Sequence, residues 1–408
     1  MALVTKTRRE QLSHAMRRRD AASPSRRSRP PNPTATAAVV AVGVVIATLV
    51  GLIAPAALGA TNPLKAGVAE LLTYYSAETG LIGTSWWQAA VALSTVETYA
   101  QTTGDHSYDG AILSAFAING AGDFENESDD DTAWWALVWL QAYDLTHVTA
   151  YLSMAETDAD YIHRAWDSAC GGGVWWQRSP RSYKNAITNE LFLELTAWLH
   201  NSVSGDTKYL RWAEAEWSWF EHSGMINSGY LINDGLGNNC QNNAGTTWTY
   251  NQGVILAGLA RLYQATGQRS LLSTAERIAV AAIGQLTVGG VLTEPEPCRG
   301  AGCPASLDAD TQAFKGIFVQ DLKVLAVTAK TTRFNAFFTR QAEAIQADDT
   351  STYHELGMLW AGPVADVSSS TQASALAALV ASVSLPRPAG SEPGLSLWIL
   401  FTDPIQIR

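Results

Sequence analysis

Residues 132–146 read TAWWALVWLQAYDLT, and this stretch decides the fold class. Apolar residues stand at almost every position, so a helix formed here is apolar on nearly all sides, which is typical of a helix buried inside a protein. The segment therefore predicts a buried helix over Thr132–Thr146. Five more segments share its composition: Ser85–Thr103, Asn185–Asn201, Tyr250–Gly267, Ala313–Ala329 and Thr371–Val383.

More amphipathic helical segments precede each of the six buried ones. They are Pro63–Thr79, Tyr108–Ala117, Thr157–Ala169, Asp206–Glu221, Arg269–Leu286 and Arg333–Ala347. The starts of the buried segments lie 47 to 65 residues apart, which is too irregular for a solenoid of short repeats. Strand-like alternation is scarce, so a parallel α/β fold is not expected. Six buried helices wrapped by six outer ones predict an all-α protein with an (α/α)6 barrel.

The loops that lead into the buried segments share a polar and aromatic composition. Two of them read FENESDDDTAWW (124–135) and LINDGLGNNCQNNAGTTWTYN (231–251). Because each such loop precedes an inner helix, we expect them all to open at one end of the barrel. Functional residues concentrate on loops held by a rigid scaffold, so the active end of the barrel is predicted here.

Composition and charge limit the classes of molecule that the protein is expected to bind. Tryptophan accounts for 15 of the 408 residues, which favours an aromatic-lined cleft. Residues 1–34 carry nine Lys/Arg and two Asp/Glu; the remainder carries 18 basic and 36 acidic residues, a net charge of −18. An acidic body argues against nucleic acid as a partner and is compatible with a neutral substrate. We expect a monomer.

The N-terminal region predicts export. Residues 34–60 carry no charge and follow several arginines in the basic segment 1–33, which places the N-terminus in the cytoplasm and the remainder outside. Residues 34–60 are either a signal peptide or an uncut membrane anchor, because about 20 apolar residues span a bilayer. The expected domains are then a catalytic barrel over 61–384 and a flexible tail over 385–408.

Four cysteines fit an extracellular protein with disulfides. Cys298 and Cys303 enclose a short loop with two glycines and form a natural pair. Cys170 and Cys240 then pair by elimination. Zinc is the alternative, but no Cys-x-x-Cys or clustered His accompanies the cysteines. The seven His show no metal-binding motif either, so neither a metal nor another cofactor is expected.

The residues with the clearest chemistry are Asp129, Asp130 and Asp131, which follow Ser128. Ser128 with Asp131 is typical of a helix N-cap pair, and acidic residues suit the first turn of a helix. At the mouth of a barrel, however, neighbouring carboxyls cannot all stay ionised cheaply, and one pKa rises while another stays low. One acid and one anion are what glycoside cleavage requires. Adjacent aspartates reach the short carboxyl separation of retaining enzymes more readily than the longer separation of inverting ones.

With these motifs in order, the chain resembles glycoside hydrolase family 76, the α-1,6-mannanases, and in particular its fungal secreted branch. The segments that carry the resemblance are Trp86–Gln88, Asp130–Leu137, Cys170–Trp176, Tyr183–Glu190, Trp217–Phe220, Leu231–Leu236, Thr249–Gly253 and Phe314–Phe318. The resemblance implies an (α/α)6 barrel, Asp130 as nucleophile, Asp131 as acid/base and Asp234 as a sugar contact. Gln320 stands where the family commonly has arginine.

Further substrate-binding residues are predicted around the acidic pair. Tryptophans occur in pairs at or just before three inner helices, and neighbouring helical residues point about 100° apart, so one can pack while the other lines the cleft. Amides near the start of an inner helix can bind sugar hydroxyls, although a polar cap is an equal alternative. The candidates are Trp87, Trp134, Trp135, Asn185, Tyr250, Asn251 and Gln252.

The predicted function is a retaining endo-α-1,6-mannosidase that hydrolyses α-1,6-linked mannan, secreted or anchored with its catalytic domain outside the cell. A cell-wall transglycosylase that moves mannan or glycosylphosphatidylinositol-glycan chains onto glucan is the alternative within the same chemistry. A non-catalytic mannan-binding protein is the alternative of another class. A terpenoid cyclase is disfavoured, because Trp134 stands where a DDxxD motif beginning at Asp130 needs aspartate.

Overall fold

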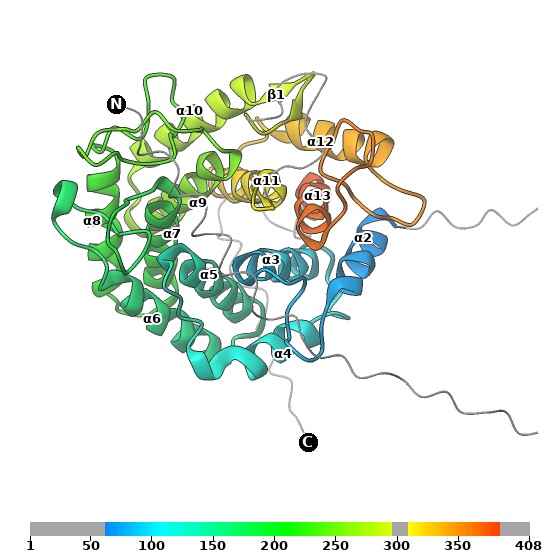
Figure 1. The fold of residues 1–408 in the computed structure, drawn as a ribbon, viewed down its shortest axis with the longest axis horizontal. Coiled ribbons are helices and arrows are strands. Elements are labelled where there is room, and N and C mark those ends of the chain that lie inside the picture. Colours follow the sequence, from blue (N-terminus) through cyan, green and yellow to red (C-terminus); the bar gives the residue numbers. More distant parts are fainter. Residues whose placement is uncertain (1–61, 296–308, 384–408) are drawn as a thin grey trace, which may run out of the picture. The chain divides into compact units, whose positions relative to one another are not determined.

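The computed structural model describes residues 62–295 and 309–383. Within these ranges the chain forms twelve α-helices and one two-stranded hairpin (Figure 1). The inner helices are α3 (Trp86–Thr103), α5 (Asp129–Thr146), α7 (Ala186–Ser202), α9 (Thr249–Thr266), α11 (Thr311–Thr328) and α13 (Ser369–Ser382). The outer helices are α2 (Pro63–Leu71), α4 (Gly110–Asn119), α6 (Thr149–His163), α8 (Lys208–Phe220), α10 (Arg269–Gln285) and α12 (Asn335–Asp348). The predicted all-α (α/α)6 barrel is confirmed.

The inner helices form a closed ring. Each packs on the next in chain order, and α13 packs on α3 to complete the circle (Figure 1). Burial explains their uniform composition: in α7 every residue from Ala186 to Leu199 is buried. The outer helices bury only one face, as α8 does through Tyr209, Ala213, Glu216 and Phe220 at helical spacing.

Local sequence fixes where several helices begin and end. At the start of α2, Asn62 Oδ1 accepts a hydrogen bond from the Leu64 N–H at 3.0 Å, and Pro63 occupies the first helical position. Gly104 ends α3 in the left-handed conformation that glycine adopts without strain. A different glycine, Gly316, lets α11 approach α13 closely, because a Cβ atom there would lie 2.4 Å from the Ser374 Cα.

Three predicted helix boundaries are wrong by several residues. α5 begins at Asp129 rather than Thr132, because the aspartates form its first turn. α6 spans Thr149–His163 rather than Thr157–Ala169; its buried face includes Asp158, a residue that sequence patterning treats as exposed. α2 ends at Leu71 rather than Thr79, and the chain continues through a 3₁₀ turn (η1, Leu72–Tyr74).

The remaining regular elements are small. Two further 3₁₀ turns, η2 (Gly120–Gly122) and η3 (Ala169–Gly171), lie in the loops. The strands β1 (Thr287–Val288) and β2 (Val291–Leu292) pair antiparallel. Among the described residues, no helix is long and apolar enough to cross a membrane.

The predicted bridge between Cys170 and Cys240 is present, with the two Cα atoms 5.1 Å apart. It joins the loop that enters α7 to the loop that enters α9, so it ties together two neighbouring entries at one end of the barrel. Cys298 and Cys303 lie outside the described residues, as do the basic segment 1–33, the apolar segment 34–60 and the tail 385–408.

Candidate active site

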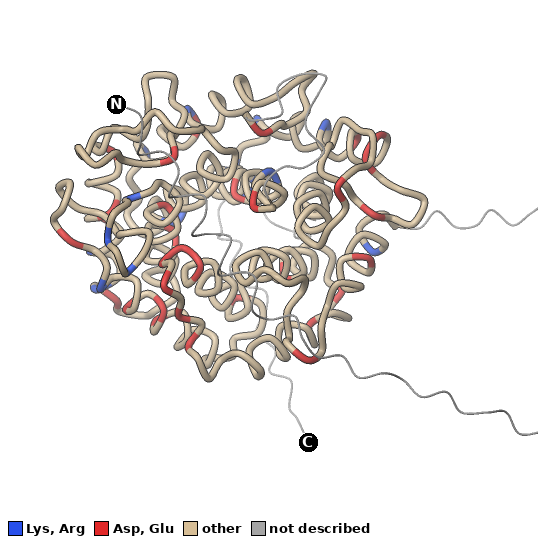
Figure 2. Tube along the Cα trace, in the orientation of Figure 1, with Lys and Arg blue, Asp and Glu red and all other residues tan. Residues whose placement is uncertain are grey.

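The acidic triplet lies at the start of an inner helix. Asp129, Asp130 and Asp131 form the first turn of α5, visible as a continuous acidic stretch in Figure 2. Ser128 occupies the N-cap position, but its side chain makes no capping hydrogen bond, so the predicted pairing of Ser128 with Asp131 is wrong. Instead, the Asp131 N–H donates to Asp130 Oδ1 at 3.1 Å. This bond and the helix N-terminus both favour an anionic Asp130 carboxylate.

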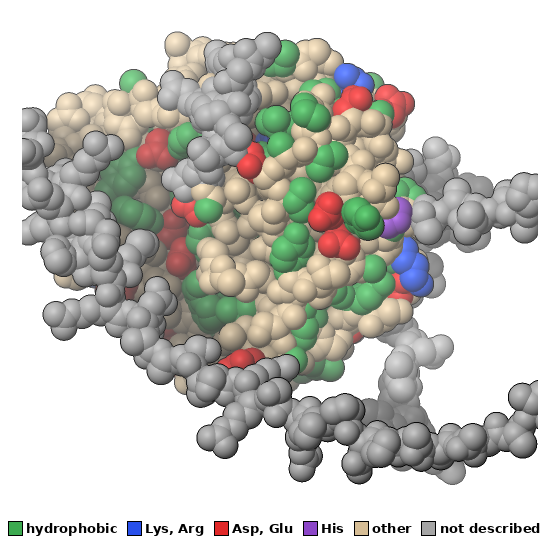
Figure 3. All heavy atoms as spheres, turned by 45° about the vertical axis from the view of Figure 1, so that its right-hand side comes forward, with side chains coloured by type: hydrophobic (Ala, Val, Ile, Leu, Met, Phe, Trp, Pro, Cys, Tyr) green, Lys and Arg blue, Asp and Glu red, His purple; other side chains and the backbone are tan. Residues whose placement is uncertain are grey.

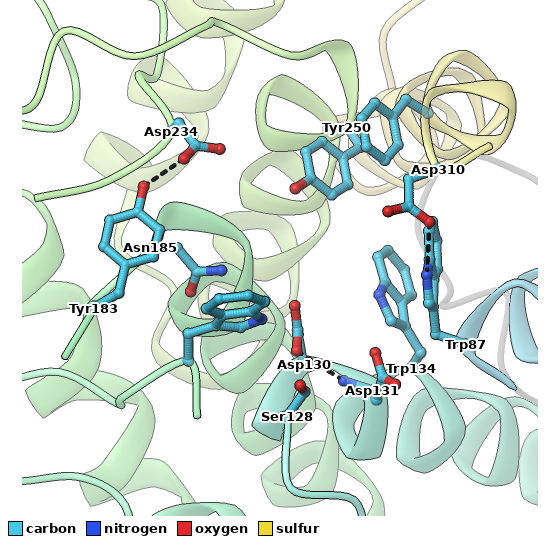
Figure 4. A pocket seen from close by; sticks show the side chains of 12 residues that line it. Trp87, Ser128, Asp130, Asp131, Trp134, Tyr183, Asn185, Asp234, Tyr250 and Asp310 are labelled. Carbon is cyan, nitrogen blue, oxygen red and sulfur yellow. Dashed lines mark hydrogen bonds between the residues drawn. The ribbon is translucent and has the colours of Figure 1, made fainter. Parts of the chain in front are cut away.

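A cavity of about 270 Å³ opens above this turn (Figure 4). Its lining comes from the loops that enter the inner helices and from the first two turns of those helices, as the polarity of the loops predicted. The lining residues are Trp87, Ser128, Asp130, Asp131, Trp134, Trp176, Tyr183, Asn185, Asp234, Tyr250, Asp310 and Phe314.

One wall of the cavity is aromatic. Trp87 of α3 stacks with Trp134 of α5 at a ring separation of 5.8 Å, and Tyr250 of α9 stacks with Phe314 of α11 at 3.8 Å. Figure 4 shows Trp87, Trp134 and Tyr250 on one side of the acidic pair. Flat apolar faces of this kind suit stacking against sugar rings.

The opposite wall is polar and held by hydrogen bonds. The Tyr183 hydroxyl donates to Asp234 Oδ2 and accepts from Asn243 Nδ2 at 3.0 Å. The Ala186 N–H donates to the Asp234 carbonyl at 2.8 Å, which joins the start of α7 to the loop that carries Asp234. The side chains of Asn185 and Asp234 therefore face the cavity from two loops that are fastened together.

Burial and mutual repulsion raise the pKa values of the carboxyls of the site. Burial, and next the charge of Asp131, raise the pKa of Asp130 well above its ordinary value. Burial, and next the charge of Asp310, raise the pKa of Asp131 to about 6. Burial also raises the pKa of Asp234, against the hydrogen bond from Tyr183. The cavity can therefore hold a proton on one carboxyl of the pair at mildly acidic pH.

Asp310 is a site residue that the sequence did not single out. Its Oδ1 accepts hydrogen bonds from Trp87 Nε1 at 3.2 Å and from Gln88 Nε2 at 3.3 Å. Gln88 is itself fixed, because its Oε1 accepts from the Ser370 hydroxyl at 2.9 Å. Asp310 stands directly before α11, in one of the loops expected at the active end. That position was the only available indication of its role.

Seven of the ten predicted catalytic and substrate-binding residues line the cavity. These are Trp87, Asp130, Asp131, Trp134, Asn185, Asp234 and Tyr250. The other three do not reach it. Ser128, Trp176, Tyr183, Asp310 and Phe314 line the cavity without having been predicted to bind substrate.

Trp135, Asn251 and Gln252 are fully buried, which corrects their predicted contact with sugar. The Trp135 ring packs against Trp86 at 5.0 Å in the hydrophobic core. Gln252 exchanges two hydrogen bonds with the backbone of Ile232, at 2.8 and 2.9 Å, and so supports the loop that carries Asp234. A polar residue in the first turn of a buried helix can thus serve a loop rather than a ligand.

Each tryptophan pair divides between cavity and interior, the first two through their helical geometry and the third, Trp175 and Trp176, in the loop before α7. Trp87, Trp134 and Trp176 line the cavity, while their neighbours in sequence do not. Trp86 and Trp135 pack in or against the core, and Trp175 Nε1 donates to Asp167 Oδ2 at 2.8 Å. Sequence pattern alone could not tell which member of each pair faces the cavity.

Metal ligands are not gathered in the part of the chain that the structure describes: no group of three or more His, Cys, Asp or Glu there is arranged to hold an ion. On the face shown in Figure 3, acidic and basic side chains lie in small groups, some of them next to one another, and hydrophobic ones in scattered patches. The cavity is therefore the feature on which a functional argument rests.

Known proteins resemble this chain over most of the barrel. The family model described as "Glycosyl hydrolase family 76" matches residues 63–390. The mannan endo-1,6-alpha-mannosidase DCW1 of Saccharomyces cerevisiae is 28% identical over 334 residues, which cover 74% of this chain and 73% of that protein. The chain spans 61% and 65% of the length of two Schizosaccharomyces pombe relatives.

Solved structures agree in fold. The GH76A alpha-1,6-mannanase from Salegentibacter sp. HEL1_6 superposes with a TM-score of 0.69 at 24% identity, covering 78% of this chain and 98% of that one. Dfg5 from Chaetomium thermophilum, solved in complex with glucosamine, gives a TM-score of 0.71 at 21% identity and covers 78% and 88%. The family match extends over the whole described barrel, and the chain accordingly belongs to glycosyl hydrolase family 76.

Proposed function

We propose that the protein is a retaining endo-α-1,6-mannosidase that cleaves the backbone of α-1,6-linked mannan. The observation that carries the proposal is the pair Asp130 and Asp131 on the floor of a cavity with aromatic stacking surfaces on one side. Fungal relatives are named mannan endo-1,6-alpha-mannosidases. An inactive variant of the Salegentibacter mannanase with two consecutive aspartates replaced by asparagine was solved with α-1,6-mannotriose.

In the proposed reaction Asp130 is the nucleophile and Asp131 the acid/base. An Asp130 carboxylate oxygen attacks the anomeric carbon while Asp131 gives its proton to the glycosidic oxygen, and the leaving chain departs as an alcohol. Water then attacks the anomeric carbon of the glycosyl ester, Asp131 takes a proton from that water, and the Asp130 carboxylate is released. Two inversions give net retention of configuration.

The roles proposed for Asp130 and Asp131 depend on which of the two carboxyls carries a proton before substrate binds. Burial raises the pKa of both carboxyls, whereas the proposed mechanism needs an ionised Asp130 and a protonated Asp131. The hydrogen bond from the Asp131 N–H favours the Asp130 anion. Because the two carboxyls titrate as a pair, one proton can move between them when a sugar fills the cavity.

Azide rescue separates the two roles. Asp130→Ala and Asp131→Ala are each assayed on an α-mannosyl substrate with a good leaving group, with and without sodium azide. We expect Asp130→Ala to form the β-mannosyl azide by direct displacement and Asp131→Ala to form the α-mannosyl azide through the glycosyl-enzyme. The reverse pattern of products would exchange the roles and leave the family activity intact.

Transglycosylation is the second candidate, in which a sugar hydroxyl replaces water in the second step. The observation that favours it is the lining of the cavity, which among the described residues includes four aspartates and neither lysine nor arginine. Such a lining suits an amine-bearing sugar, and Chaetomium Dfg5 was solved with glucosamine. Incubation with α-1,6-mannotetraose, with and without a laminarin-type acceptor, distinguishes the outcomes. Shorter mannose chains alone indicate a hydrolase, acceptor-linked products indicate a transferase, and unchanged α-1,6-mannotetraose refutes cleavage of this backbone by either route.

We further propose that the barrel acts outside the cell as a monomer, either secreted or held by residues 34–60. The Cys170–Cys240 disulfide supports this location, because such bonds persist in oxidising compartments. Fractionation of the expressing cells, followed by N-terminal sequencing of the mature protein, tests the proposal. A first residue near 60 indicates cleavage, an intact N-terminus in the membrane fraction indicates an anchor, and recovery in the cytosol contradicts both.

A further inference from the structure

An ion pair lies directly behind the catalytic turn of α5. Arg178 Nη2 is 2.9 Å from Asp129 Oδ1; the Asp129 side chain is fully buried and that of Arg178 is 17% exposed. Neither residue lines the cavity. Asp129 is nevertheless bonded in sequence to Asp130, and Arg178 lies two residues after Trp176, which lines the cavity. The pair therefore connects two segments that both contribute to the site.

The backbones of these segments are joined as well. The Asp129 N–H donates to the Trp176 carbonyl at 2.8 Å, and the Arg178 N–H donates to the Glu127 carbonyl at 3.0 Å. Between these bonds, Ser128 and Gln177 form an antiparallel bridge. The ion pair closes the far end of this short ladder, so a displacement of Arg178 is transmitted to both Trp176 and the first turn of α5.

The guanidinium of Arg178 is held on its other side by α6. It lies over the Tyr161 ring at 3.3 Å, and Nη2 also donates to the Tyr161 carbonyl. The Tyr161 hydroxyl donates to the Asn126 carbonyl at 3.1 Å, which returns to the loop before α5. Arg178 thus has its orientation fixed by an aromatic face, a carbonyl and a buried carboxylate.

We propose that Arg178 and Asp129 are a positioning pair for the reaction proposed above: they hold Asp130 and Asp131 in register with Trp176 and fix a negative charge beside Asp130. The inference rests on the proposed function for its kinetic readout. The planar guanidinium, stacked and hydrogen-bonded at once, provides an orientation that lysine does not reproduce.

The charge of Asp129 gives the proposal a signature that a purely structural role lacks. Burial raises the pKa of Asp129 to about 7, against Arg178, which lowers it; Arg181 and Glu127 also act on it. An ionised Asp129 raises the pKa of Asp130. Because Asp129 is half ionised at about pH 7, replacing it by asparagine makes Asp130 easier to ionise in the neutral range and moves the acidic limb of the pH profile to lower pH there.

The experiment compares Asp129→Asn, Arg178→Gln, Arg178→Lys and a matched control, Arg164→Gln. Arg164 also lies over the Tyr161 ring, at 5.1 Å, but it is 62% exposed and pairs with Glu125. We measure kcat and KM on α-1,6-mannotetraose across pH. Circular dichroism and thermal unfolding confirm that each variant is folded, and Arg178→Lys keeps the test open if Arg178→Gln does not fold.

We expect Arg178→Gln to lower kcat about 100-fold with KM changed much less, as misplacement of reacting groups by about 1 Å does. Asp129→Asn shifts the acidic limb of kcat/KM to lower pH, Arg178→Lys restores part of kcat, and Arg164→Gln behaves as the wild type. If Arg178→Gln and Asp129→Asn match Arg164→Gln in kcat and pH profile, the positioning role is refuted.

A second measurement does not depend on turnover. In Arg178→Gln, hydrogen exchange of the peptides that contain the Asp129 and Arg178 amides should accelerate, while Arg164→Gln leaves it unchanged. If the wild-type protein does not cleave or transfer mannan, the proposed function fails, and exchange still decides whether Arg178 holds the two segments together. Unchanged exchange in Arg178→Gln overturns the inference, whatever the activity.

Discussion

Trp134 and Trp135 are neighbours in sequence with opposite surroundings. Trp134 lines the cavity and stacks with Trp87, whereas Trp135 is fully buried in the core. We expect Trp135→Ala to destabilise the fold by about 3–5 kcal/mol through the cavity that it leaves. Trp134→Ala should weaken binding of α-1,6-mannotriose with little change in stability. Calorimetry of binding and denaturant unfolding of both variants check the contrast, and equal losses of stability would contradict it.

Asp310 gives a second prediction at the scale of single residues. Its charge contributes to the raised pKa of Asp131, which is about 6. In the proposed mechanism Asp131 must carry a proton, so loss of that proton sets the basic limb of kcat/KM. Asp310→Asn removes the repulsion, lowers the pKa of Asp131 and should move the basic limb to lower pH. Asp310→Glu, which keeps the charge, is the control; an unmoved or raised limb in Asp310→Asn argues against the assignment.

Individual site residues were predictable only where their chemistry stands out in the sequence. The Asp130–Asp131 pair could be recognised because adjacent carboxyls at a buried helix are unusual. Asp310 could not, because its nearness to Asp131 depends on the packing of α3 against α5 and on hydrogen bonds from Trp87 and Gln88. For Gln252 the capacity of the side-chain amide to form hydrogen bonds was recognised, but its partner was not, since a buried amide binds the backbone of a loop as readily as a sugar.

At the scale of elements, the Cys170–Cys240 bridge joins the entries to α7 and α9 across 70 residues of sequence. Replacing both cysteines by serine should lower the free energy of unfolding by about 2–4 kcal/mol, because the crosslink restricts the unfolded chain.

The short loop between Cys298 and Cys303 would restrict the unfolded chain less, so Cys298→Ser should lower the melting temperature less than Cys170→Ser. Non-reducing peptide mapping and calorimetric melting test both statements; a Cys240–Cys298 crosslink would refute the pairing.

Two glycines in helices should respond oppositely to alanine. A Cβ at Gly316 of α11 would meet the backbone of Ser374 in α13, whereas a Cβ at Gly284 of α10 would meet no described atom within 4 Å. We expect Gly316→Ala to destabilise by about 1–3 kcal/mol, because neither backbone can yield without shifting a ring helix. Gly284→Ala should stabilise by about 0.4–1 kcal/mol, because alanine lowers the entropy of the unfolded chain. Urea unfolding decides, and a stable Gly316→Ala variant would show that the ring can expand.

The elements themselves were largely predictable, because the ring requires helices that are apolar all round. All six inner segments were located within a few residues. The outer helices were harder, since their polar faces merge with the loops. The start of α6 was missed because its N-cap is Val148, whose side chain makes no capping hydrogen bond that a sequence pattern could indicate.

Over the whole barrel, buried carboxyls dominate the dependence of stability on pH. Burial raises the pKa of Glu216 to about 8 and that of Glu194 to about 7, and raises those of Glu97, Asp158 and Glu190 well above normal. The folded protein then binds more protons than the unfolded chain, so its stability falls as pH rises from about 4.5 towards 8. Melting temperatures at pH 5, 6.5 and 8, at constant ionic strength, check this expectation.

Glu216→Gln is the matched variant for that measurement. The Glu216 side chain accepts a hydrogen bond from Trp166 Nε1 at 2.8 Å, and Lys184 is the nearby cation that opposes the rise in its pKa. The substitution removes one titrating group from the folded core and should flatten the fall of melting temperature between pH 5 and 8. A melting temperature that rises across this range in the wild type would contradict the account.

Because α13 closes the ring and is the last of the ring helices to be synthesised, the barrel can close only after α13 has been made. Gln372 Nε2 in α13 donates to the Gly67 carbonyl in α2, and the Ser370 hydroxyl donates to Gln88 Oε1 in α3. At a synthesis rate of about 5–20 residues per second, α3 waits on the order of tens of seconds for its last neighbour. During that interval one flank of α3 has no partner within the ring, and Cys170 and Cys240 both emerge from the ribosome before α13 does. The nascent chain can therefore be crosslinked before its barrel can close.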